Sequence, residues 1–208
     1  MSSLSTSTAN FSSGPCGTMP TAYGTGHACY NAVSNGPGNN FGNGSFTLSG
    51  VYFFSGNLTI GGNASITNPP GGTATLILLP GSTLTINGTP TIQLTAPSSV
   101  SSTQVPAALA TPTIQKLMID LLIYDPEPYS KQGVNISGNS TSYFNGTVYV
   151  PNAPVTYGGN SSASAPVPGC YQVVAYAITF SGNTNLDERK CNQDHAVQPQ
   201  ASTVRLVQ

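Results

Sequence analysis

Hydrophobic residues recur along this chain in short runs separated by Gly, Asn and Pro. Two successive sets of runs are Val51 to Phe54, Leu58 to Ile60 and Ser65 to Thr67, then Leu76 to Leu79, Leu84 to Ile86 and Thr91 to Leu94. Each run is too short for a helix, and apolar and polar residues alternate in the shorter ones. Both features are typical of β-strands bounded by turns.

The same kind of run continues to the C-terminal part of the chain. The later runs are Ile119 to Tyr124, Val134 to Ile136, Ser142 to Phe144, Thr147 to Val150, Val155 to Tyr157, Gln172 to Ala177 and Ile178 to Phe180. Repeating units of roughly 20 to 27 residues with two or three short strands predict a right-handed parallel β-helix of about five coils. The alternative all-β interpretation is an antiparallel β-sandwich, which also has closely spaced short strands.

The pattern divides the chain into two parts and one insertion. Residues 1–44 are rich in Gly, Ser, Asn and Pro, and we expect an irregular N-terminal cap there. Residues 45–208 form the predicted β-helix domain. Residues 96–115 interrupt its rhythm, and Pro106 and Pro112 limit this inserted loop to at most a short helix. Residues 203–207 are predicted to be a closing strand.

Charge is scarce, which narrows the classes of partner. Charged residues make up 5% of the chain and the formal net charge is −1, whereas soluble proteins average about 25% charged residues. Without a basic stripe, neither nucleic acid nor an anionic membrane surface is an expected partner. No apolar run reaches the length of about 18 residues that spans a bilayer.

The four cysteines point to an oxidising compartment. Cys16, Cys29, Cys170 and Cys191 make an even set in a chain poor in charge, so we expect disulfides and an extracytoplasmic location. Adjacency favours Cys16 with Cys29 and Cys170 with Cys191, although four cysteines allow three pairings. The first residues lack the features of a signal peptide, so we expect any membrane anchor to lie upstream.

Several segments together resemble a known family. They are Gly50 to Tyr52, Gly56 to Ile60, Asn145 to Tyr157, Cys170 to Ala175, Cys191 and Val204 to Val207. In this order they are similar to the C-terminal β-helical region of TadG-like proteins, of the tight-adherence (Flp-type) pilus-assembly family. The resemblance covers about residues 45–208 and implies a cell-envelope setting with an upstream anchor. It implies no catalytic residues.

Candidate catalytic chemistry is limited to one pair of acids. Asp125 and Glu127 lie two residues apart, which places both side chains on one face of an extended segment. Such a pair can act as acid and base, as in a polysaccharide lyase or hydrolase, or can bind Ca²⁺. The flanking Pro126 and Pro128 favour a rigid, solvated turn instead. The sequence therefore predicts a protein that is not an enzyme.

Neither a metal site nor a cofactor is predicted. His27 lies near Cys29 and His195 near Cys191, but neither cluster has the paired spacing of a structural zinc site. Asn-x-Ser/Thr sequons are frequent, and Asn as a turn residue explains most of them. Sequons make the chain a candidate glycoprotein in a host that glycosylates. They begin at Asn10, Asn43, Asn57, Asn63, Asn87, Asn135, Asn139, Asn145 and Asn160.

Tyrosines provide the candidate binding surface. Tyr143, Tyr149 and Tyr157 fall in the middle of the chain, and an exposed row of them can stack on sugar rings or dock a protein. We therefore expect a structural or adhesive module of the cell envelope, associated with pilus assembly or surface attachment. Its expected partners are envelope or pilus proteins, or surface glycans. The alternatives are a carbohydrate-binding or carbohydrate-processing β-helix and a self-assembling filament subunit, because solenoid ends expose strand edges.

Overall fold

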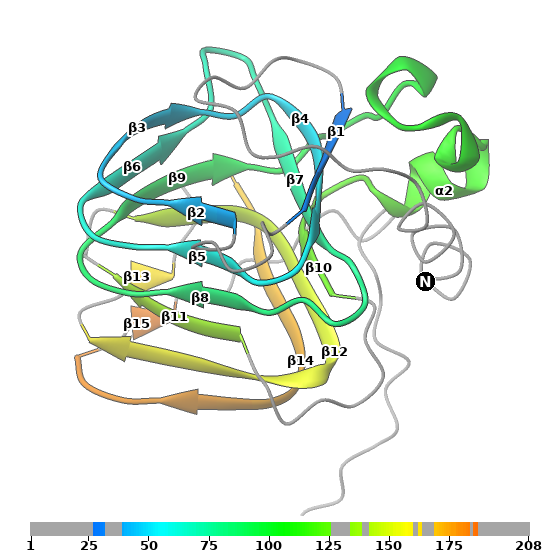
Figure 1. Cartoon of the computed structure of the whole chain (residues 1–208). Coiled ribbons are helices and arrows are strands. Elements are labelled where there is room, and N and C mark those ends of the chain that lie inside the picture. Colours follow the sequence, from blue (N-terminus) through cyan, green and yellow to red (C-terminus); the bar gives the residue numbers. More distant parts are fainter. Residues whose placement is uncertain are drawn as a thin grey trace, which may run out of the picture.

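The fold is described from a computed structural model. It covers residues 27–31, 39–125, 134–138, 142–159, 162–163, 169–183 and 185–186. The described chain is mostly strand with little helix. Its strands form a parallel sheet that curls into a nearly closed, solenoid-like shape (Figure 1).

Parallel strand pairs align in three ladders. The first ladder contains β1 (His27–Asn31), β4 (Gly50–Ser55), β7 (Ala74–Leu78), β10 (Leu121–Tyr124) and parts of β12 (Tyr143–Gly159) and β14 (Tyr171–Phe180). The second contains β2 (Asn39–Phe41), β5 (Leu58–Ile60), β8 (Leu84–Ile86), β11 (Val134–Gly138) and later parts of β12 and β14.

The third ladder contains β3 (Gly44–Thr47), β6 (Ala64–Thr67), β9 (Thr91–Thr95) and the start of β12. A separate short pair joins β13 (Ser162–Ala163) and β15 (Asn185–Leu186). All the described pairs are parallel, so the alternative of an antiparallel sandwich is wrong. The predicted runs from Val51 to Leu94 each coincide with a strand, whereas the last five runs merge into the long strands β12 and β14.

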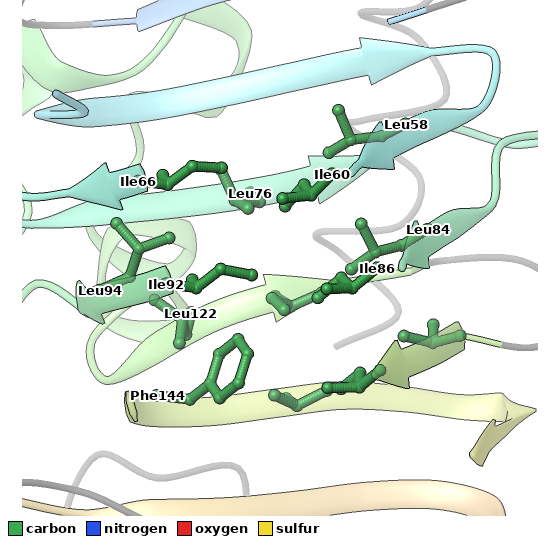
Figure 2. Close-up of a cluster of buried hydrophobic side chains, with 14 of the residues drawn as sticks. Leu58, Ile60, Ile66, Leu76, Leu84, Ile86, Ile92, Leu94, Leu122 and Phe144 are labelled. Carbon is green, nitrogen blue, oxygen red and sulfur yellow. The ribbon is translucent and has the colours of Figure 1, made fainter. Parts of the chain in front are cut away.

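The core lies between the ladders. Alternating residues point inward, as in the buried, half-buried, buried pattern of both Leu-Thr-Ile strands β5 and β8. Identical side chains then stack from one layer to the next, and Figure 2 shows Leu58 with Leu84, Ile60 with Ile86, and Ile66 with Ile92. This stacking explains why the repeat is visible in the sequence, since each inward position contacts its own equivalent in the next layer.

Glycines at the corners allow this close stacking. Gly62 and Gly88 occupy equivalent corners of adjacent layers, with φ of 61° and 78°. A Cβ atom on Gly88 would lie 2.9 Å from the carbonyl oxygen of Gly62. Glycine is therefore required there both for its positive φ and for space.

The segment expected to be irregular joins the same ladders. β1 and β2 lie within residues 1–44, yet β1 pairs with β4 and β2 pairs with β5. The expectation of an irregular cap is therefore wrong for these strands. Their turn-rich sequence hides them, because the partner strand supplies the hydrogen bonds that fix their extended backbone.

The insertion between β9 and β10 folds against the outside of the first ladder. It contains η1 (Ser102–Gln104), η2 (Ala107–Leu109) and α2 (Pro112–Leu117), which lie beside the sheet in Figure 1. Thr111 caps α2 by accepting a hydrogen bond from the Ile114 N–H at 3.4 Å, and Pro112 follows in the first turn. Of the two possibilities that the sequence left open, a short helix or an irregular loop, the structure contains the short helix.

A second hydrophobic cluster lies under the insertion. We call it the outer cluster, and its buried members are Val51, Phe53, Ile77, Leu79, Val105, Leu109, Ile114, Met118, Leu121 and Tyr124. It buries the outward side chains of β4, β7 and β10, so these strands are buried on both faces. That double burial accounts for their unbroken apolar runs, in contrast to the alternating runs of the second ladder.

Candidate functional site

A row of polar side chains follows the outer face of the second ladder. We call it the polar ladder, and it consists of Asn40, Thr59, Thr85, Asn135, Thr156 and Thr179. Each of these residues is in register with the next one across a parallel strand pair. Adjacent members are therefore separated by the interstrand distance of about 4.8 Å. Asn40, Asn135 and Thr179 are exposed, and the other three are half-buried.

Side-chain hydrogen bonds hold the borders of this face in place. On one side the Thr83 hydroxyl donates to Asn57 Oδ1 at 2.8 Å. At the opposite corner the Thr89 hydroxyl donates to Asn63 Oδ1, also at 2.8 Å. Asn43 Oδ1 in turn accepts from the Asn63 N–H. These bonds join neighbouring layers at both borders of the face, so the amide and hydroxyl groups there are held in fixed positions.

The three predicted tyrosines do not lie on one face. Tyr157 is buried at 1% exposure and points into the core, so it belongs to no surface row. Tyr149 is half-buried, and its ring stacks on Tyr124 at 5.8 Å beside the outer cluster. Tyr143 points outward and is half-buried. The prediction of a shared tyrosine surface is therefore wrong for Tyr157, and Tyr149 and Tyr143 are on different ladders.

Tyr157 instead forms a buried polar contact. Its hydroxyl is hydrogen-bonded to the hydroxyl of Tyr171, which is also fully buried. Burial raises the pKa of Tyr157 to about 12, and the hydrogen bond from Tyr171 partly opposes this rise. The pair keeps two hydroxyls satisfied inside an apolar core, which is a structural role.

Of the predicted acid pair, only Asp125 lies within the described residues. Asp125 is buried at 5% exposure, and its backbone N–H donates to the Tyr149 carbonyl oxygen at 3.1 Å. The expectation that Asp125 is solvated is wrong, because this residue is buried directly after the end of β10. Glu127 lies outside the described residues, so the pairing of the two acids remains a prediction.

Cys170 is disulfide-bonded. Its N–H donates to Asn145 Oδ1 at 2.8 Å, and its carbonyl oxygen accepts from Gly146, so it is tied to β12. Cys16 and Cys191 lie outside the described residues, and Cys29 is described only as part of the backbone of β1. The two disulfide pairings therefore remain predictions.

Strand β14 carries a surface that the sequence did not predict. The large hydrophobic side chains that are exposed in the described chain are Tyr176, Ile178 and Phe180, at 64%, 39% and 49%. All three lie on this one strand at the end of the ladders. No pattern in the sequence signals this exposure, because Ile178 and Phe180 follow the same alternation as the inward residues of other strands.

One small hollow lies between the first ladder and the insertion. This cavity of about 10 Å³, lined by Gly50, Val51, Thr73, Pro97, Val100 and Gln104, has the size of a single water molecule. Among the described residues no three His, Cys, Asp or Glu side chains cluster as metal ligands. No helix there is both long enough and apolar enough to cross a membrane.

Comparison with known proteins found no family model, curated protein or solved structure that matches this chain.

Proposed function

We propose that this chain is a non-catalytic structural or adhesive module of the cell envelope, located outside the cytoplasm and active in pilus assembly or surface attachment. In this proposal its fold is a right-handed parallel β-helix of about five coils. The polar ladder is the observation that supports an adhesive role. The disulfide bond of Cys170 supports the location, because disulfides persist in oxidising compartments.

The chemistry of the polar ladder favours surface glycans over charged polymers as the adhesive target. Hydroxyl and amide groups both donate and accept hydrogen bonds, as do the hydroxyl groups of a sugar chain. Their regular separation of about 4.8 Å presents the same groups repeatedly along one direction. A net charge of −1 provides little attraction for an anionic polymer. We therefore propose a neutral, extended polysaccharide as the ligand.

Removing the hydroxyl groups tests this proposal with little change in shape. The triple variant Thr59→Val, Thr85→Val and Thr156→Val keeps three β-branched side chains and removes three hydroxyls. We expect the native chain to sediment with insoluble cellulose, chitin or xylan, and the variant to lose most of that binding. Thr67→Val is the matched control, because Thr67 is half-buried on the outer side of β6 in the third ladder.

The same samples separate binding from processing. Binding without release of reducing ends or unsaturated sugars supports the proposed adhesive function. Release of such products would favour the alternative of a carbohydrate-processing enzyme. Failure of the native chain to bind any of the three polymers, or equal binding by the triple variant, would overturn the polar ladder as the adhesive face.

A further inference from the structure

Strand β14 is the last layer of the first two ladders in the described chain. In Figure 1 it lies at the opposite end of the stack from β1 and β2. Ile178 is in register with Val155, and Phe180 with Tyr157. Val155 and Tyr157 are both core residues, so Ile178 and Phe180 occupy inward positions. They are exposed because no further described layer covers them.

The inner layers show what normally covers such positions. Ile60 is buried against Ile86, and Ile66 against Ile92, with further layers on either side. The Phe180 ring already stacks on the Tyr157 ring at a centroid distance of 5.5 Å and an angle of 16°. A side chain from a further layer would stack on the other face of the Phe180 ring and continue the column of core side chains. Covering it would extend an existing packing arrangement.

The backbone of β14 is also suited to receive another strand. Within the part of the chain that the structure describes, β14 pairs only with β12, so its second edge has no ladder partner. The strand has ten residues and is therefore about 33 Å long. It contains no charged residue. Long, uncharged and partly apolar edges are the ones that pair with other strands.

We propose that a second copy of this chain covers β14, with the two β14 strands paired antiparallel about a two-fold axis. This inference goes beyond the proposed adhesive function and does not depend on it. A two-fold axis perpendicular to β14 brings the same surface of each copy together and makes the two equivalent strands antiparallel. The partner must offer uncharged apolar side chains on an edge that has no ladder partner among the described strands, and β14 itself has both properties.

The register of β14 makes the two halves of the strand complementary. Its pairing with β12 shifts between the positions of Val150 and Pro154. As a result Val173 and Ala175 face the core in the first ladder, whereas Ile178 and Phe180 do so in the second. A two-fold axis next to Tyr176 places Ile178 of one copy opposite Ala175 of the other, and Phe180 opposite Val173. All four inward side chains are then covered, and the exposed Tyr176 lies at the centre.

Sedimentation of the full chain over a wide range of concentration tests the proposal. We expect a reversible equilibrium between monomer and dimer. Ile178→Lys and Phe180→Lys should each raise the dissociation constant about 30-fold or more, as for a residue central to an interface. Thr179→Ser is the matched control, because Thr179 is exposed on the same strand but points outward, and serine adds no charge to the pairing edge. We expect the control to dimerise like the native chain.

Ile178→Ser provides a second variant that adds no charge, and circular dichroism checks that each variant folds. A chain that stays monomeric at every concentration would overturn the proposal, whatever covers β14 in that monomer. Open-ended oligomers that grow with concentration would overturn the two-fold arrangement. A dimer that survives both Ile178→Ser and Ile178→Lys would show that the interface lies elsewhere.

Discussion

At the scale of single residues, Gly146 shows what the sequence could and could not predict. A Gly at this position was expected to mark a turn between two strands. In the structure it lies inside β12, where the chain passes from the third ladder to the first. Its φ is 145°, and a Cβ atom there would lie 2.5 Å from the Cβ of Ala96. The need for glycine comes from a contact with the insertion, which no local pattern reveals.

Tyr157 gives a prediction about pH. The folded state raises its pKa from 10.0 to about 12, so folding favours the protonated hydroxyl. The resulting contribution to stability is complete below pH 10 and is lost as the pH rises through 12. For two pKa units this amounts to about 2 to 3 kcal/mol. Tyr149, whose pKa burial also raises, acts in the same direction.

Urea unfolding at a series of pH values from neutral to about 12 measures this effect. We expect the free energy of unfolding of the native chain to fall across the alkaline range. Tyr157→Phe should be less stable at neutral pH by about 1 kcal/mol, because Tyr171 loses its partner. As the pH rises through the alkaline range, the free energy of unfolding of this variant should fall less than that of the native chain. An equal decline in both proteins would contradict burial of the ionisable hydroxyl.

At the scale of elements, the apolar runs predicted the strands, but they did not reveal the facing of side chains along the long strand β12. In Leu58 to Ile60 and Leu84 to Ile86 the alternation of apolar and polar residues matches the observed alternation of buried and half-buried side chains. Tyr149 and Tyr157 are eight positions apart, and simple alternation places them on the same face. The register shift between Val150 and Pro154 reverses the facing, so Tyr149 points outward and Tyr157 inward. A local irregularity of this kind reverses the side of the sheet that every later side chain in the strand faces.

The insertion between β9 and β10 also acquires its role only in three dimensions. Its sequence predicts a short helix at most, but its apolar residues bury the outer face of the first ladder. Leu109 is fully buried in the outer cluster. We expect Leu109→Ala to lower the free energy of unfolding by about 2 to 5 kcal/mol, as for other buried leucines.

Denaturation in urea, with the midpoint and slope compared, checks this value. Thr113→Ala is a control on the same insertion, because Thr113 is exposed in α2 and alanine is the better helix former. The control should not be destabilised. If Leu109→Ala leaves the midpoint unchanged, the insertion is an appendage that contributes little to the fold.

At the scale of the whole molecule, self-similarity was the feature that predicted the architecture. Two copies of Leu-Thr-Ile with similar flanks sufficed to predict stacked parallel strands, because equivalent positions contact each other in successive layers. The polar ladder follows from the same register, yet it was not predicted. Its members are Thr in some strands and Asn in others, and only the pairing of β2, β11 and β14 shows that they share one row.

Stacking also predicts how stability varies along the molecule. Each layer contacts only its neighbours, so an outer layer loses fewer contacts when it opens than an inner one. Backbone amides of β5 and β8, which have paired strands on both sides, should exchange hydrogen most slowly. Amides of β14 should exchange faster at low protein concentration, by about tenfold for each 1.4 kcal/mol of difference in opening free energy.

Hydrogen exchange followed by mass spectrometry at two protein concentrations measures this gradient and connects it with self-association. Raising the concentration should slow exchange in β14 selectively, because pairing with a second copy protects its second edge, while β5 and β8 stay unchanged. In the Phe180→Lys variant, β14 should still exchange faster than β5 and β8, but its exchange rate should not depend on protein concentration. Exchange in β14 as slow as in β8 at the lowest concentration would contradict layer-by-layer stability. It would mean that the solenoid opens as one cooperative unit, in which its end is no weaker than its middle.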